Sequence, residues 1–167
     1  RQEMPGIVPV VAAAHASAEE EIQRIGDGLK EQLKILREQT YTVLNSADVA
    51  VVVSGTVTLE AALLGVPQVV VYRTSSSTYY VAKMLLRIPH VALPNIVVGR
   101  EIVPELLQNE ATPSNIADHL KRIWQDEESR LIQAGYGEVR QRLGETGAIS
   151  RAARIVLDIA IQQSEAK

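Results

Sequence analysis

Residues 47–72 read ADVAVVVSGTVTLEAALLGVPQVVVY, and this stretch decides the fold. Residues 47–53 form a short, apolar and mostly β-branched run, which is typical of a strand buried on both faces of a parallel sheet. Residues 56–64 have helix-forming composition, and Gly65-Val66-Pro67 ends that helix because Gly suits a left-handed cap and Pro cannot continue a helix. Residues 69–72 read as a second buried strand. This order predicts a βαβ unit.

The turn between the first strand and the helix, Ser54-Gly55-Thr56, has the chemistry of an anion site. The first backbone N–H groups of a helix lack partners inside the helix, and the helix dipole adds partial positive charge there. Such a turn suits a phosphate, and Gly55 lets the backbone come close to it.

The chain before this unit alternates between strand and helix patterns. We expect strands at 7–13 and 33–36 and helices at 17–29 and 40–45, the first helix beginning with a capping box of Ser17 and Glu20. This alternation predicts an α/β fold with a doubly wound, Rossmann-like parallel sheet that binds ligands at the carboxyl ends of its strands.

The chain after this unit is more irregular. We expect a helix at 79–87, a short strand at 90–93 and an inward-packing loop at 94–100, which would place Asn95 and Arg100 near the cleft. From Pro113 the composition is helical, with expected breaks at 135–137 and 144–147.

Composition narrows the class of protein. The 167 residues include 46% apolar side chains, 4% aromatic side chains and no Cys, and the net charge is −3. One domain with a Val, Leu, Ile and Ala core is expected, without disulfides or thiolate metal sites. The net charge gives no overall positive electrostatic potential that would favour binding of nucleic acid. No apolar run reaches the roughly 18 residues of a transmembrane helix. We therefore expect a soluble cytoplasmic domain.

Residues 61–100 contain no Asp or Glu, although they include Arg73, Lys83, Arg87 and Arg100. A bound anion and a solvated basic helix face both account for this cationic region. Glu60, one turn into the helix, also has two interpretations. It stabilises the helix dipole, or it accepts hydrogen bonds from a ribose diol. No P-loop, nucleophile elbow or Asp-x-Asp motif is present, so anion binding without a metal is the remaining chemistry.

Several of these residues, with others along the chain, carry a family resemblance. They are Ala47-Asp48, Ser54-Gly55-Thr56, Thr58-Leu59-Glu60-Ala61, Gly65-Val66-Pro67, Val70-Val71-Tyr72-Arg73, Ala82-Lys83, Leu93-Pro94-Asn95, Gly99-Arg100-Glu101 and Pro104-Glu105-Leu106-Leu107-Gln108. Together they resemble lipid-A-disaccharide synthases, colinearly from about Ile7 to the C-terminal helices.

The resemblance implies a two-domain GT-B glycosyltransferase that works on the cytoplasmic face of the inner membrane. Such an enzyme transfers 2,3-diacylglucosamine from UDP to 2,3-diacylglucosamine 1-phosphate, with inversion and without a metal or cofactor. By the resemblance, Ser54, Gly55 and Thr56 line the UDP diphosphate and Glu60 binds the ribose. Asn95 and Arg100 line the rest of the donor cleft, and Arg73 and Glu101 also match the motifs of this site.

The chain departs from the family pattern at its start. It lacks the N-terminal domain that binds the lipid acceptor and is expected to supply the catalytic carboxylate, so we expect no catalytic residue here. Residues 1–112 are expected to form an incomplete donor domain, with helices at 113–167 packing on it. We expect weak UDP binding at most, and no turnover. Another UDP-sugar GT-B enzyme, an epimerase and a non-catalytic nucleotide-sugar-binding module are the alternatives, and the 93–101 motifs argue against the first two.

Overall fold

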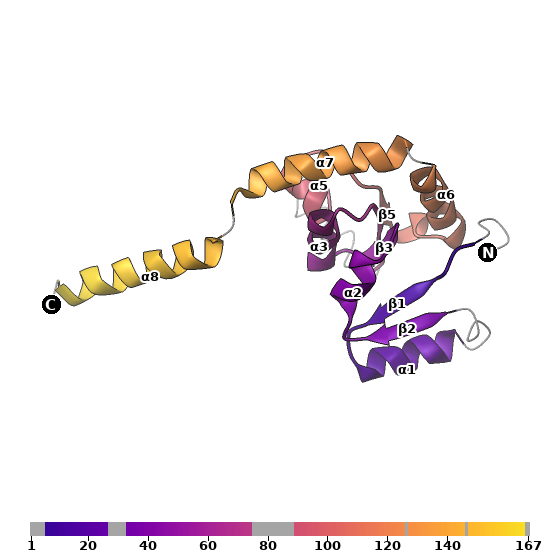
Figure 1. The fold of residues 1–167 in the computed structure, drawn as a ribbon, viewed down its shortest axis with the longest axis horizontal. Coiled ribbons are helices and arrows are strands. Elements are labelled where there is room, and N and C mark those ends of the chain that lie inside the picture. Colours follow the sequence, from indigo (N-terminus) through magenta and orange to yellow (C-terminus); the bar gives the residue numbers. More distant parts are fainter. Residues whose placement is uncertain (1–5, 27–32, 75–88, 126, 146, 166–167) are drawn as a thin grey trace.

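The computed structural model describes residues 6–26, 33–74, 89–125, 127–145 and 147–165 (Figure 1). The strands are β1 (Val10–Ala13), β2 (Lys34–Arg37), β3 (Ala50–Val53), β4 (Gln68–Tyr72) and β5 (Glu105–Leu107). The helices are α1 (Ala16–Ile25), α2 (Thr40–Asn45), α3 (Thr56–Leu64), α5 (Leu93–Val98), the 3-10 helix η2 (Gln108–Glu110), α6 (Pro113–Trp124), α7 (Glu127–Leu143) and α8 (Ala148–Glu165).

All strand pairs in the described residues are parallel, and the fold is the expected Rossmann-like α/β arrangement. The strands form two sheets: β1 pairs with β2, and β3, β4 and β5 pair in that order. Strand β3 therefore lies at a sheet edge. This position corrects the expectation that β3 is buried on both faces, because Val51 and Val53 are 45% and 61% exposed.

The central βαβ unit is confirmed. Helix α3 begins at Thr56 and ends at Leu64, where Gly65 takes the left-handed conformation with φ 80° and donates its N–H to the carbonyls of α3. Strand β4 follows, and its residues Val69 and Val70 are fully buried. The core lies around them, where α3, α5, α6 and α7 gather on the three-stranded sheet (Figure 1).

The predicted loop at 94–100 is wrong, because most of it forms the short helix α5, and the strand expected at 90–93 is absent from the described residues. The N-cap Ala92 and Pro94 in the first turn start the helix, and Gly99 ends it with φ 75°. The helix predicted at 79–87, which includes Lys83 and Arg87, lies outside the described residues.

The predicted capping box of α1 is also wrong. The helix begins at Ala16, and its N-cap is His15, whose Nδ1 accepts a hydrogen bond from the N–H of Ala18 at 3.2 Å. An imidazole nitrogen with a free lone pair can satisfy an N-terminal N–H group as a hydroxyl does.

The predicted break at 135–137 is wrong, because α7 runs through both glycines. The reason is close packing of the helix on the chain before β5. A Cβ atom on Gly135 would lie 2.8 Å from Cβ of Ile102, whereas one on Gly137 would meet nothing within 4 Å. The predicted break at 144–147 is confirmed, with Gly144 and Gly147 at φ 75° and 94°.

These two glycines give a matched pair of substitutions. Gly137→Ala is expected to stabilise the chain by up to ~1 kcal/mol, because alanine favours a helix. Gly135→Ala is expected to destabilise it by about 1–2 kcal/mol, because the clash with Ile102 outweighs that preference. Urea unfolding of both variants measures the difference, and equal stabilisation by both would show that Gly135 is not needed for packing.

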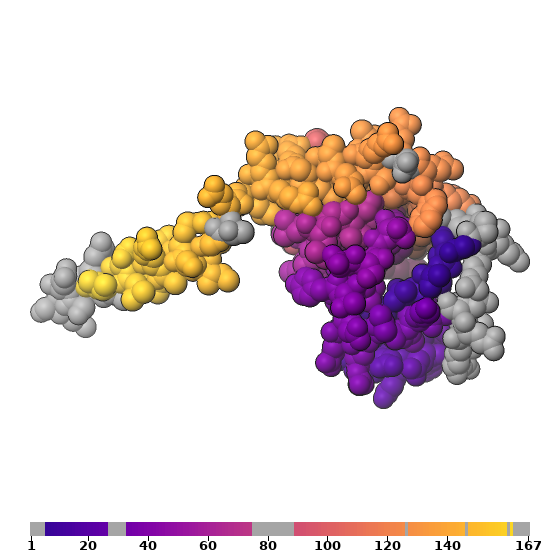
Figure 2. Space-filling view, in the orientation of Figure 1, coloured from indigo at the N-terminus to yellow at the C-terminus, as the bar shows by residue number. Residues whose placement is uncertain are grey.

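Helices α6 and α7 pack on the body, but α8 extends away from it (Figures 1 and 2). Every α8 side chain whose burial is described is exposed, including Ile149 at 88% and Val156 at 66%. The structure differs here from the expectation that all helices in 113–167 pack on the donor domain. Among the described residues, no helix has both the length and the apolar character needed to cross a membrane.

Candidate functional site

The carboxyl ends of the three-stranded sheet bring several polar residues to one edge. Ser54 follows β3, Arg73 follows β4 and Gln108 follows β5. The register pairs Val53 with Val71 and Tyr72 with Leu107, so these strands end side by side. Ligands of parallel α/β sheets bind at this edge, and α3 also begins there.

The turn at the start of α3 is open. Gly55 is the N-cap, and no side chain caps the helix. Gly55 and Thr56 are exposed, and nothing lies within 4 Å of the position that a Cβ of Gly55 would take. The first N–H groups of α3 therefore lie beside open space, where an anion can approach them.

Ser54 has a different role from the one its motif suggests. Its hydroxyl donates to the carbonyl of Val91 at 2.8 Å, and its N–H donates to the carbonyl of Val71 at 3.2 Å. The hydroxyl proton is thus used within the fold. An anion at this turn would meet the backbone N–H groups of α3, not a donating Ser54 hydroxyl.

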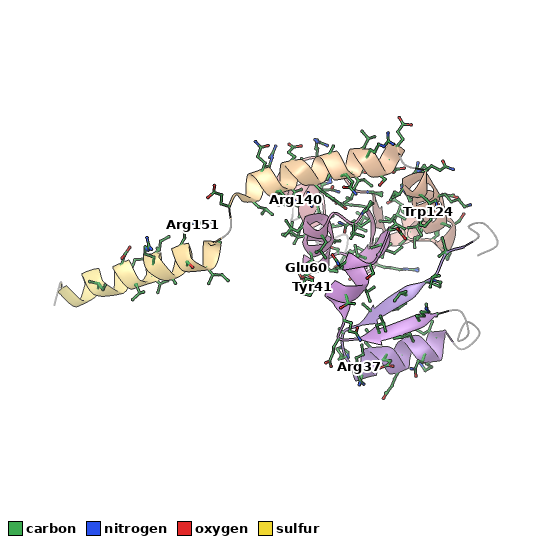
Figure 3. All side chains as sticks on the ribbon, viewed as in Figure 1. Arg37, Tyr41, Glu60, Trp124, Arg140 and Arg151 are labelled. Atoms are coloured by element: carbon green, nitrogen blue, oxygen red, sulfur yellow. The ribbon has the colours of Figure 1, made fainter. Side chains whose placement is uncertain are left out.

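Arg73 and Glu60 remain accessible to a ligand at this edge. Arg73 is exposed directly after β4, and Glu60 is half-buried on α3. Figure 3 labels Glu60 on α3 and Tyr41 on α2, and these two helices pack together. In the part of the chain that the structure describes, the side chains of Arg73 and Glu60 make no hydrogen bond or ion pair with another residue.

Asn95 does not face the cleft. Its side chain is fully buried, and its Oδ1 accepts from the N–H groups of Ile102 and Val103 at 2.8 and 3.0 Å. Its Nδ2 donates to the carbonyl of Val103 at 2.9 Å and to Oε1 of Glu105 at 2.7 Å. All four bonds are internal, so Asn95 holds the chain between α5 and β5.

Arg100 and Glu101 also lie away from the turn. The exposed Arg100 guanidinium contacts the carboxylate of Glu138 on α7 at 2.7 Å, and Arg142 contacts the same carboxylate at 3.1 Å. Desolvation acts to raise the pKa of Glu138, but these two guanidinium groups outweigh it and lower the pKa below its usual range. Glu101 lines an open hollow between β5 and α6, whose lining includes no residue of the 54–56 turn.

Three further residues hold backbone segments near this edge of the sheet and were not among the predicted site residues. Oγ1 of Thr58 donates to the carbonyl of Gly55 at 2.7 Å, and Glu105 accepts hydrogen bonds from the chain before α5. Gln108 has φ 52°, and its Oε1 accepts from the N–H of Thr74 at 3.3 Å. Glu105 and Gln108 belong to the 104–108 motif, which was the only sequence signal for them.

The described residues contain no cluster of three or more His, Cys, Asp or Glu side chains that could hold a metal. The groups that this edge presents to a ligand are the backbone N–H groups of α3, the guanidinium of Arg73 directly after β4, and the carboxylate of Glu60 on α3.

Comparison with known proteins gives a consistent result. A family model described as lipid-A-disaccharide synthetase matches residues 1–159. A lipid-A-disaccharide synthase of Myxococcus xanthus is 43% identical over 159 residues, which is 94% of this chain and 41% of that protein. A second, from Geobacter metallireducens, is 39% identical over 162 residues, or 95% of this chain and 42% of that protein.

A third relative of the same name, from Anaeromyxobacter dehalogenans, is 46% identical over 129 residues, which is 77% of this chain and 34% of that protein. The chain thus spans about two fifths of the length of the first two relatives, at 41% and 42%. With the family model matching nearly the whole chain, the protein belongs to the lipid-A-disaccharide synthetase family.

Proposed function

We propose that this chain is the donor-binding part of a glycosyltransferase that makes the lipid A disaccharide. The full-length protein would transfer 2,3-diacylglucosamine from UDP-2,3-diacylglucosamine to 2,3-diacylglucosamine 1-phosphate. The observation that carries the proposal is the open amino end of α3 at the carboxyl edge of the sheet, in a chain of this family.

The diphosphate of UDP would lie at the turn of Ser54, Gly55 and Thr56. The backbone N–H groups and the dipole of α3 favour a negative charge there, and Arg73 supplies a guanidinium from the adjacent strand. Asn95, Arg100 and Glu101 are not part of this proposed contact set, because their side chains face other elements.

The ribose of UDP would lie further along α3, at Glu60. Glu60 is four residues after Thr56, which places it about 6 Å along the helix axis. A carboxylate oxygen pair can accept hydrogen bonds from both hydroxyls of a ribose diol. Its separation from the turn also keeps its charge away from the diphosphate.

The catalytic groups and the lipid acceptor site would lie outside this chain. We propose that residues 1–112 are the donor domain, and that the chain binds UDP without transferring sugar. In the full-length protein the reaction would take place at the cytoplasmic face of the inner membrane, where a lipid acceptor is held.

A comparison of two ligands tests the ribose contact. The chain is expected to bind UDP about tenfold more tightly than 2′,3′-dideoxy-UDP, because hydrogen bonds to a carboxylate contribute about 1.5–3 kcal/mol. In Glu60→Gln this preference should shrink to about threefold or less, because the charge is lost. Isothermal titration calorimetry measures the affinity of both ligands for the unmodified chain and for Glu60→Gln.

Glu101→Gln is the matched control for this test, because it removes an exposed carboxylate beside α6. It is expected to keep the full preference for UDP. An unchanged preference in Glu60→Gln, or a lost one in Glu101→Gln, would contradict the placement of the ribose.

A further inference from the structure

The start of α3 is held from one side by the turn 91–93. Oγ of Ser54 donates to the carbonyl of Val91 at 2.8 Å, and the N–H of Leu93 donates to Oγ1 of Thr58 at 3.2 Å. Oγ1 of Thr58 also donates to the carbonyl of Gly55 at 2.7 Å. The turn 91–93 thus contacts the residues on both sides of Gly55.

The turn 91–93 is itself held by one carboxylate. Oε2 of Glu105 accepts from the N–H of Val91 at 3.0 Å, and its Oε1 accepts from the N–H of Ala92 at 3.0 Å. Oε1 also accepts from Nδ2 of Asn95 at 2.7 Å. The Glu105 side chain is only 7% exposed, so these bonds form away from water.

Residues 90–92 belong to no helix or strand, so no regular ladder fixes their backbone. Buried N–H groups need acceptors, and two successive N–H groups around one anion form a compact nest. A carboxylate on a sheet strand can fill such a nest with charge-assisted bonds. Glu105 therefore connects β5, through the turn 91–93, to the amino end of α3.

We infer that Glu105 is a positioning residue for the donor site. It fixes the turn 91–93, and that turn fixes the backbone around Gly55 in the orientation that receives an anion. The inference rests on the proposed function for its ligand, a nucleoside diphosphate at the start of α3. A preformed set of N–H donors binds an anion better than one that must be ordered during binding.

The chemistry of the carboxylate is essential to this role. Glutamine has the same length, but its amide group would place a second donor against the N–H of Val91 or Ala92, since only one of its two polar atoms accepts. The turn 91–93 would then shift to relieve the unsatisfied pair, and the hydrogen bond to Ser54 would loosen with it.

The test compares Glu105→Gln with the unmodified chain of 167 residues. UDP affinity, measured by isothermal titration calorimetry, is expected to fall about tenfold. A fall of this size is what the loss of one buried, charge-assisted hydrogen bond produces. The control is Val139→Ala, a truncation of a buried side chain on α7 that lowers stability but removes no hydrogen-bond partner of the turn 91–93. It is expected to leave UDP affinity within about twofold, because all the hydrogen bonds that hold the turn stay in place.

Amide hydrogen exchange without ligand separates this inference from the proposed function. Glu105→Gln is expected to speed exchange at Val91, Ala92 and Leu93, while amides in the middle of α7 keep their protection. Ser54→Ala should also weaken UDP binding. The double variant Ser54→Ala/Glu105→Gln should lose less binding free energy than the sum of the two single variants, because both residues act through Val91.

If Glu105→Gln does not fold, Ser54→Ala and exchange at the turn 91–93 still decide the matter. Two results would overturn the positioning role alone. One is that Glu105→Gln binds UDP as tightly as the unmodified chain, and the other is that amide exchange at residues 91–93 is unchanged in Glu105→Gln. No UDP binding by the unmodified chain, with faster exchange in Glu105→Gln, would overturn the proposed ligand and leave the structural connection standing.

Discussion

Tyr136→Ala is expected to lower the free energy of unfolding by about 3–5 kcal/mol, the range for removing a buried aromatic side chain. Tyr136 lies on α7 and is fully buried against the three-stranded sheet. Its hydroxyl donates to the carbonyl of Val66 at 3.0 Å and accepts from Nε2 of Gln68 at 2.9 Å. The ring and its hydrogen bonds therefore attach α7 to the end of α3 and the start of β4.

Tyr136→Phe separates the two contributions. It keeps the ring but leaves the Val66 carbonyl and the Gln68 amide without this partner, so a loss of about 1–3 kcal/mol is expected. Burial raises the pKa of the Tyr136 hydroxyl, so it stays protonated as a donor. Urea unfolding measures both variants, and a loss below about 1 kcal/mol in Tyr136→Ala would show that α7 is not anchored by this residue.

Gly55→Asp is expected to reduce UDP affinity at least tenfold while leaving the chain as stable or slightly more stable. Aspartate is a better N-cap than glycine by a few tenths of a kcal/mol, and Gly55 has room for a side chain. Its carboxylate would occupy the place of the diphosphate, and like charges about 4 Å apart repel by about 1–4 kcal/mol. Stability and affinity are therefore expected to change in opposite directions.

Gly55→Asn is the matched control, because it has nearly the same shape and also caps a helix but carries no charge. Its UDP affinity is expected to lie between those of the unmodified chain and Gly55→Asp. Thermal unfolding and calorimetry give the two readouts. Equal UDP affinity in Gly55→Asp and the unmodified chain would place the diphosphate elsewhere.

The βαβ unit at residues 47–72 could be predicted because its signals are local. A β-branched run, a helix-forming segment and a Gly-Val-Pro stop lie next to one another, and the structure confirms their order. The two-sheet arrangement could not be predicted this way, since which strands pair depends on contacts between distant segments.

Helix α5 was missed because its six residues carry no polar face and its ends depend on Pro94 and Gly99. The same residues read as turn formers when no packing partner is known. Likewise, Gly135 looked like a helix break, whereas it provides the close approach to Ile102 that a larger residue would prevent. Both misreadings came from tertiary contacts that override local preference.

The candidate site was predictable where backbone chemistry carries it. A Gly turn between a strand and the helix that follows it indicates an anion site through its backbone N–H groups, independently of the side chains, and the structure leaves this turn open. Asn95 and Arg100 show what the sequence cannot predict. A motif identifies a polar residue, but it does not show which groups the side chain of that residue contacts. Asn95 bonds to the chain before β5 and Arg100 to Glu138 on α7.

The central claim is that UDP binds at the amino end of α3, and amide chemical shifts of the labelled chain test it most directly. Titration with UDP is expected to give saturable shifts that are largest at Gly55, Thr56 and Val57, with a further shift at Arg73. Saturable shifts centred instead on the hollow between β5 and α6, at Glu101 and Arg122, would contradict the claim, as would the absence of shifts at millimolar UDP.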